Sequence, residues 1–174
     1  TIFDPSIVNL FFSDNAANAT IKGVEGDFTY YTNVEGLSVA GAFSILNTNI
    51  DDALVPTNDV VVGTDLAFAP GHQGNIRVRK ETGMSGGNVG HVQVQYTFSD
   101  SSFSDIMGPN KAKQDSYSYI DLRAGISNDE LTAELYVDNV TDERAEISNT
   151  FVFDRQRITY IRPTTIGIRV KKNF

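Results

Sequence analysis

Apolar and polar residues alternate one by one along most of this chain. The clearest run spans residues 91–99, in which Val92, Val94, Tyr96 and Phe98 alternate with His91, Gln93, Gln95 and Thr97. Successive side chains of a β-strand point to opposite faces, so this period predicts a strand with one apolar and one polar face. No stretch keeps a helical period over a useful length. The sequence therefore predicts an all-β protein.

The other runs of the same kind cover most of the chain. We expect strands at 19–32, 37–45, 75–82, 91–99, 119–126, 130–137 and 164–174, a stub at 1–3 and a strand extension at 157–160. The connections between them alternate in length: 46–73, 100–115 and 141–162 are long, whereas 33–36, 83–90 and 127–129 are short. Short turns on one side and long loops on the other are typical of outer-membrane barrels. The sequence thus predicts an antiparallel meander of about seven to eight strands.

The closing stretch fits this interpretation. Ile166, Ile168 and Val170 are expected to face lipid, while Arg169 and Lys171 face the lumen. The chain ends on Phe174, for which the aromatic belt at the membrane interface offers a place. A soluble β-sandwich also alternates, with its apolar face against a second sheet. The recurrence of both charge signs on the polar faces favours the barrel, and a sandwich-type binding module is the alternative.

Composition narrows the function. The 174 residues carry a net charge of −8, which argues against binding nucleic acid. Cysteine is absent, so disulfides, zinc–thiolate sites and cysteine nucleophiles are excluded. No apolar run approaches the roughly 20 residues of a membrane helix.

Candidate chemistry is sparse. The only histidines, His72 and His91, are far apart in sequence, and no catalytic constellation emerges. His91 is expected to form a hydrogen bond at the start of its strand. Residues 47–52 place oxygen-bearing side chains as in a calcium loop but lack its glycine and distal glutamate, so we expect a polar loop. We expect no enzyme, no cofactor and no metal site.

Three segments resemble the C-terminal part of a TonB-dependent outer-membrane receptor. Residues 15–25 are similar to a strand opening of that family, residues 135–144 to its penultimate strand, and residues 162–174 to its last strand. The motif residues are Gly23, Glu25, Asn139, Asp142, Arg162 and Pro163, and the resemblance implies a structural role for them. It also implies that Ile166, Ile168, Val170 and Phe174 form the barrel-assembly signal, which Lys172 interrupts.

The resemblance implies a barrel of about 22 strands with a plugged lumen. Residues 1–174 would be its C-terminal segment, with the plug, the TonB box and the earlier strands missing. The implied function is energy-coupled uptake of a scarce solute, such as a siderophore, cobalamin or a carbohydrate, across the outer membrane of a Gram-negative bacterium. The implied partners are outer-membrane lipid, the TonB complex (through the missing N-terminal part), the barrel-assembly machinery and a small solute. A self-contained barrel of eight strands with a structural or adhesive role is the alternative.

Four charged residues are candidates for the lumen: Asp121, Arg123, Glu134 and Arg169. If Asp121 pairs with Arg123 and Glu134 with Arg169, the pairs either line a solute path or fix the strand register. The long loops are the expected place of ligand contact. Phe151, Phe153 and Tyr160 would offer stacking surfaces there or extend strands above the membrane.

Overall fold

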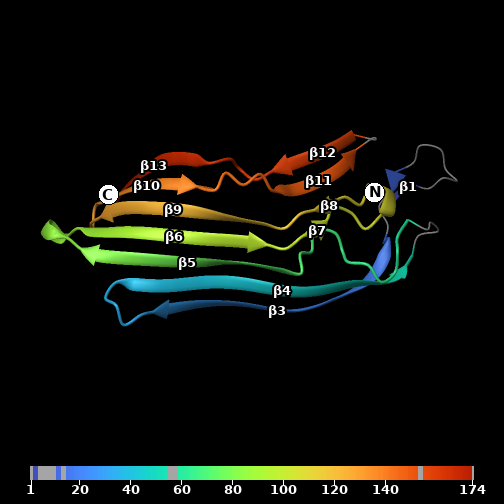
Figure 1. Cartoon of the computed structure of the whole chain (residues 1–174), viewed down its shortest axis with the longest axis horizontal. Coiled ribbons are helices and arrows are strands. Elements are labelled where there is room, and N and C mark those ends of the chain that lie inside the picture. The colour runs from blue at the N-terminus through green and yellow to red at the C-terminus, as the bar shows by residue number, and fades with distance from the viewer. Residues whose placement is uncertain (1, 4–10, 13–14, 55–58, 153–154, 174) are drawn as a thin grey trace.

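A single antiparallel sheet of seven strands dominates the computed structural model (Figure 1). The structure describes residues 2–3, 11–12, 15–54, 59–152 and 155–173. Each of the seven strands pairs with the next one along the chain, which confirms the predicted all-β meander. The strands are β3 (Ala17–Tyr31), β4 (Leu37–Ala53), β5 (His72–Gly83), β6 (Val89–Ser99), β9 (Tyr117–Ser127), β10 (Leu131–Asp138) and β13 (Thr165–Lys172).

Shorter elements lie at the end of the sheet where the long connections are. They form three two-stranded ribbons: β1 (Ile2–Phe3) with β2 (Phe11–Phe12), β7 (Ser102–Phe103) with β8 (Lys113–Gln114), and β11 (Glu146–Val152) with β12 (Arg155–Tyr160). Two single-turn helices, η1 (Ser85–Gly87) and η2 (Gly108–Asn110), complete the described elements. No helix among the described residues has the length and apolar character needed to cross a membrane.

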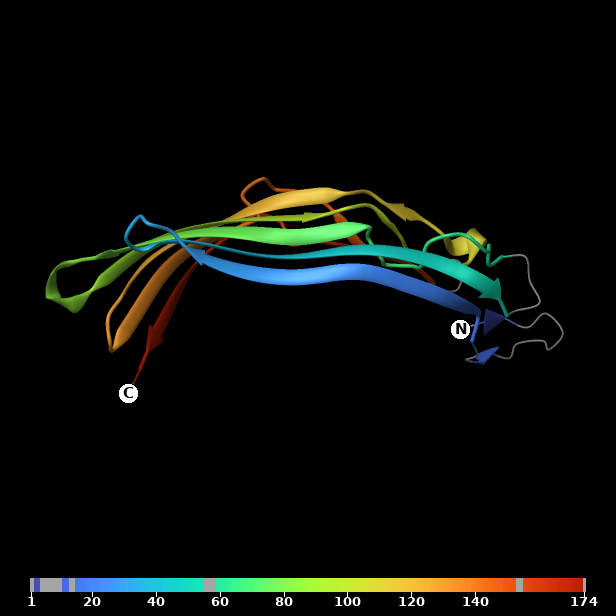
Figure 2. The ribbon, with the colours of Figure 1, turned by 90° about the horizontal axis from the view of Figure 1, so that it is seen from below.

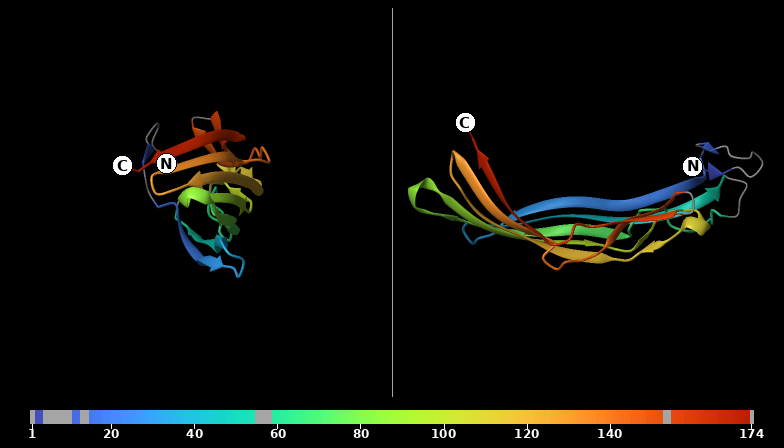
Figure 3. Two further views of the ribbon diagram at one scale, coloured as in Figure 1. Left: turned by 90° about the vertical axis from the view of Figure 1, so that its left-hand side faces the viewer. Right: turned by 90° about the horizontal axis from the view of Figure 1, so that it is seen from above.

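The sheet is a curved wall. Figure 2 shows it bent along its strands, and the end-on view in Figure 3 shows the strands following one another in an arc, with β3 and β13 at the two edges. Among the described residues no second sheet packs on either face, so the sandwich alternative is wrong. The apolar face is instead open: Ile166, Ile168 and Val170 are 65–74% exposed. An apolar surface of this size indicates contact with something other than water.

The register sorts side chains onto two faces. One row across the sheet contains only apolar and aromatic residues: Tyr30, Val39, Val78, Val94, Leu122, Val137 and Ile166. The row of residues next to it, on the opposite face, contains Tyr31, Ser38, Arg79, Gln93, Arg123, Tyr136 and Gly167. We call the first face the outer face. We call the second the lumenal face, because a closed barrel would enclose it.

The apolar band runs obliquely across these rows. On β3 it extends from Val24 to Tyr30, and on β10 from Leu131 to Val137. Tyr30 and Val137 belong to the same row. On β3, however, Tyr30 is the band residue nearest the short turns. On β10, Val137 is the band residue nearest the long connections. A band that is level with a membrane therefore requires tilted strands. Tilt is what closure of a sheet into a barrel demands.

Strand β4 is longer than the sequence predicted. It continues to Ala53, so the expected connection 46–73 is wrong and the loop covers 54–71 instead. Beyond Ile45 the polarity of the two faces is exchanged: Asn47 and Asn49 take the outer side, whereas Ile50 is fully buried on the lumenal side. The outer side there carries polar side chains, while the inner side packs against the connection 54–71. This exchange marks the outer boundary of the apolar band.

Smaller differences concern the other expected boundaries. Strand β3 begins at Ala17, two residues early, and β10 begins at Leu131. The expected extension at 157–160 belongs to β12, which pairs with β11 in a separate ribbon. The stub at 1–3 includes β1, which pairs with β2. Phe153 and Phe174 lie outside the described residues.

Candidate functional site

The junction between β10 and β13 is built around the side chain of Asn139. Its Nδ2 donates to the carbonyl oxygens of Glu143 (3.0 Å) and Arg162 (2.8 Å), and its Oδ1 accepts from the N–H of Glu143 (2.9 Å). The residue is 4% exposed and has a left-handed φ of 52°, which asparagine tolerates better than most residues. Its own N–H donates to Oδ1 of Asp121 (2.8 Å). One side chain thus holds the exit of β10 and the approach to β13 together.

Asp142 continues this junction. Its Oδ1 accepts from the N–H of Thr164 (3.1 Å), and its Oδ2 lies 3.1 Å from Nη2 of Arg144. The hydroxyl of Thr164 donates to the carbonyl oxygen of Asn139 (2.8 Å). The backbone N–H of Thr164 and the guanidinium of Arg144 favour the charged carboxylate, so the pKa of Asp142 is lowered from its ordinary value of 3.8.

A charge cluster on the lumenal face spans four strands. Glu134 on β10 is its centre: its carboxylate lies 3.1 Å from Nε2 of His91, 3.4 Å from Nη1 of Arg123 and 3.2 Å from Nη1 of Arg169. Arg123 also contacts Asp138 (3.0 Å). The side chain of His91 is 3% exposed, and its Nδ1 is buried without a partner among the described residues. Cross-strand ion pairs of this kind fix the register.

The cluster brings together three of the four candidate lumenal charges. Glu134 and Arg169 pair as the sequence suggested, whereas Arg123 pairs with Glu134 and Asp138. No Asp121–Arg123 pair occurs among the described ion pairs, because the two residues lie on the same strand and Asp121 accepts from Asn139 instead. His91 and Asp138 were not assigned to a charge cluster from the sequence. Their parity with Glu134 was visible there, but only the register places His91, Gly125 and Glu134 in one row.

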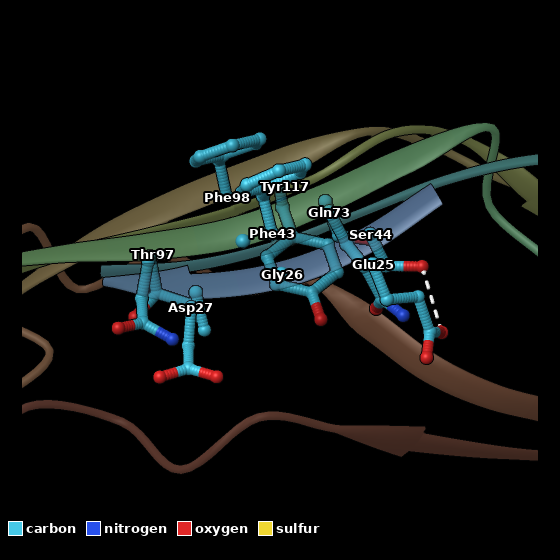
Figure 4. A pocket seen from close by; sticks show the side chains of 13 residues that line it. Glu25, Gly26, Asp27, Phe43, Ser44, Gln73, Thr97, Phe98 and Tyr117 are labelled. Atoms are coloured by element: carbon cyan, nitrogen blue, oxygen red, sulfur yellow. Dashed lines mark hydrogen bonds between the residues drawn. The ribbon is translucent and has the colours of Figure 1, made fainter. Parts of the chain in front are cut away.

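A groove of about 550 Å³ lies nearer the long connections (Figure 4). Its polar residues have lumenal positions, whereas Phe43 and Phe98, which also line it, have outer-face positions. Figure 4 shows Glu25 and Asp27 on the side of the sheet opposite to Phe98. Glu25 accepts from the hydroxyl of Ser44 (3.2 Å). The polar residues that line the groove are Glu25, Asp27, Ser44, Gln73, Asn75, Thr97, Ser99 and Tyr117. Two carboxylates and no lysine or arginine line it, so the groove has an acidic character.

Two tyrosine rings stand at the edge of this groove. Tyr117 and Tyr119 share the lumenal face of β9, and their rings are nearly parallel, with an interplanar angle of 10° and centroids 6.4 Å apart. Tyr117 also lines a smaller hollow of about 150 Å³ beneath the long connections, together with Gln73 and Ser99. The groove and the hollow therefore adjoin, and they join the lumenal face to the loops.

The long connections pack against one another rather than standing apart. The connection 54–71 meets the connection 100–116 through a bridge between Val60 and Met107, and the N–H of Gly108 donates to the carbonyl oxygen of Asp59 (2.7 Å). The buried Gln114 reaches the carbonyl oxygen of Glu146 on β11 (3.3 Å). These contacts make one connected rim above the groove.

The remaining motif residues lie in the backbone of the wall. A side chain at Gly23 would collide with the carbonyl oxygen of Ile45 on β4. Arg162 contributes its carbonyl oxygen to Asn139, and the carbonyl oxygen of Pro163 accepts from the hydroxyl of Thr165 (2.9 Å). In the expected assembly signal, Ile166, Ile168 and Val170 share the outer face of β13. Lys172 lies opposite Leu131 at the end of the same face.

A family model described as "TonB dependent receptor-like, beta-barrel" matches residues 1–140. The chain belongs to this family of TonB-dependent receptors. Barrels of the family are outer-membrane proteins. The family consists of receptors and transporters rather than enzymes.

Solved structures of receptors share the fold. The ferric yersiniabactin uptake receptor FyuA from Yersinia pestis is similar over 92% of this chain, with a TM-score of 0.74 and 18% identity. The ferric citrate transporter FecA is similar over 88% (TM-score 0.68, 16% identity), and the siderophore receptor PiuA from Acinetobacter baumannii over 87% (TM-score 0.61, 12% identity). The chain spans 24%, 24% and 21% of these three proteins, respectively. No curated protein matches the sequence.

Proposed function

We propose that residues 1–174 are the C-terminal wall of a TonB-dependent receptor that imports a scarce solute with energy supplied through TonB. The plug, the TonB box and the preceding strands belong to the rest of that receptor in this proposal. The observation that carries it is the continuity of the acidic groove with the hollow beneath the connected rim, through Gln73, Ser99 and Tyr117. A solute captured at the rim would meet this wall next.

We propose a metal chelate of the siderophore class as the solute. The three receptors of similar fold are described by ferric yersiniabactin, ferric citrate and a siderophore. The acidic groove adds a restriction that belongs to this chain. Glu25 and Asp27 would repel a polyanionic chelate at short range, so a neutral or cationic chelate is favoured.

A carbohydrate is the second candidate, and the tyrosine pair favours it. Parallel rings such as those of Tyr117 and Tyr119 offer a flat apolar surface, and the neighbouring amides and carboxylates suit hydroxyl groups. A siderophore-class chelate and a carbohydrate predict uptake of different probe molecules. No feature of this wall favours cobalamin as the solute.

The proposal is tested in cells that express the intact receptor. Uptake of radiolabelled ferrioxamine B (cationic), ferric citrate (anionic) and maltohexaose (neutral sugar) is measured with and without a functional TonB. We expect TonB-dependent uptake of the cationic chelate, lowered by Tyr117→Ala and by Glu25→Gln. Tyr31→Ala, at the opposite end of the lumenal face, is the matched control and should leave uptake unchanged. If uptake of all three probes were the same with and without a functional TonB, the transport role would be contradicted. TonB-dependent uptake of ferric citrate alone would contradict the charge preference.

A further inference from the structure

The two open edges of the sheet carry opposite charge on the lumenal face. At one edge, β13 places Arg169 and Lys171 on that face, and at the other edge β3 places Glu25 and Asp27 there. Neither edge has a partner strand among the described residues. Charged side chains on unpaired edges are a common protection against wrong pairing. The separation of sign between the edges is a more specific feature.

The positive edge is incompletely neutralised within the wall. Arg169 contacts Glu134, but the same carboxylate also serves Arg123 and His91. The side chain of Arg169 is 64% exposed. Lys171 lies opposite Thr132, and the side chain of Thr132 carries no charge. The lumenal face of β13 therefore presents two cations for which β10 supplies one shared carboxylate.

Strand direction decides between the possible partners. A second copy of this chain would offer Glu25 and Asp27 on β3, which match Arg169 and Lys171 in charge. However, β3 and β13 are separated by six antiparallel pairings and so run in the same direction. A copy added edge to edge in the same membrane orientation would form a parallel pair, whereas every pairing in the sheet is antiparallel. The partner that fits is an antiparallel strand of the same receptor from outside these residues.

We propose that the strand which pairs with β13 carries carboxylates at the lumenal positions directly opposite Arg169 and Lys171. Residues directly opposite each other in an antiparallel pair have Cβ atoms about 4.5–5.5 Å apart, which is within reach of an ion pair. These pairs would join the charge cluster around Glu134 and extend it across the seam. The seam would then be selected by charge as well as by backbone hydrogen bonds. The proposal rests on the barrel architecture and holds whatever the solute is.

The first test identifies the partner strand in the intact receptor. The chain has no cysteine, so Lys171→Cys introduces a single thiol in this segment. This variant is combined with a second cysteine, placed at one lumenal position at a time on the strand of the intact receptor that would pair with β13. Disulfide formation is followed on gels. We expect one crosslink within the receptor, at a position where the natural residue is Asp or Glu. A crosslink at a neutral or basic position, or between two receptors, overturns the proposal.

The second test measures what the charges contribute to closure. The double variant Arg169→Glu with Lys171→Glu should lower the temperature at which the barrel loses its compact form on gels in dodecyl sulfate. Changing the two facing carboxylates to lysine in that background should restore it. Arg77→Glu is the matched control, because Arg77 is lumenal but lies on β5, inside the sheet. A double variant no more labile than this control, or no recovery on the second reversal, overturns the proposal.

Discussion

Asn139 shows how one residue decides the course of the chain between two membrane strands. Its left-handed backbone turns the chain out of β10, and its side chain satisfies backbone groups on both sides of the loop. A buried backbone group that loses its hydrogen-bond partner costs about 1–3 kcal/mol. Asp142, also left-handed with φ 48°, fastens the loop to Thr164. These contacts hold β13 beside β10.

Asn139→Ala should lower the free energy of unfolding of the intact receptor by about 1–3 kcal/mol, because the carbonyl of Arg162 and both backbone groups of Glu143 lose their partner. The measurement is urea unfolding in detergent. Asn139→Gly keeps the left-handed backbone at little cost. Most of the loss should therefore persist in the glycine variant. Full stability of the glycine variant would show that only the backbone conformation matters.

The lowered pKa of Asp142 gives the junction a pH dependence. A carboxyl whose pKa is lower in the folded state contributes stability above its unfolded pKa, near 3.8 here, and loses it as the pH falls through its folded pKa. Asp142→Asn should therefore be less stable than the natural receptor at neutral pH, and the difference should vanish at the acid end. Thermal unfolding of both proteins between pH 7 and pH 2 measures it. A difference that grows on acidification would contradict this origin.

At the scale of the strands, glycines make room for large side chains on the neighbouring strand. A Cβ at Gly125 would lie 2.7 Å from the ring of His91 and 2.6 Å from the carbonyl oxygen of Ala133. The ring of Tyr136 covers Gly167 in the same manner, with Arg123 and Arg169 each 5.7 Å from that ring. Such pairs of an aromatic ring and a glycine help to set the register. The charge cluster depends on them.

Gly125→Ala should destabilise the intact receptor, because the carbonyl of Ala133 is backbone and cannot yield as a flexible side chain would. The matched control is Gly83→Ala, where an added Cβ meets nothing within 4 Å. Heat-induced unfolding on gels compares the two variants. Equal stability of both would contradict the close packing of His91 over Gly125.

At the scale of the whole molecule, the two faces of the wall differ in polarity. Val94 faces outward in the middle of the apolar band of β6, and its neighbour Gln95 faces the lumen. The same substitution at these positions therefore tests the assignment of the faces. Val94→Arg should cost about 2–4 kcal/mol of folding free energy, the value for a cation at the bilayer midplane. Gln95→Arg should cost little, and the reverse order in lipid refolding titrations would contradict the assignment.

The isolated segment should aggregate in water. It exposes the outer face over seven strands and leaves the edges of β3 and β13 unpaired. Residues 1–174, purified without detergent, should elute as large particles in size-exclusion chromatography and become smaller when detergent is added. A monodisperse monomer in plain buffer would contradict the wall architecture.

Strict alternation within the membrane was enough to predict the seven strands, their antiparallel order and most of their face assignments. It worked because a sheet with one apolar and one polar face imposes a period of two over the length of each strand. The same rule failed on β4 above Ile45, where the outer side carries polar side chains and Ile50 turns inward to the packed loops. Apolar residues of β4 beyond Ile45 face inward and polar residues face outward. A rule that expects apolar residues on the outer face therefore predicts a loop where the strand continues.

The candidate site divides in the same way. Parity alone put Asp121, Arg123, Glu134 and Arg169 on one face, and the motif marked Asn139 and Asp142. Parity did not decide which charged side chains form ion pairs with one another. Partners on different strands depend on the strand register, and the register is set by turns, bulges and glycine packing along the whole sheet. The closing strand illustrates both parts. Its alternation predicted which residues share a face, whereas only the tertiary structure showed that Arg169 shares Glu134 with two other side chains and that Lys171 faces an uncharged neighbour at an open edge.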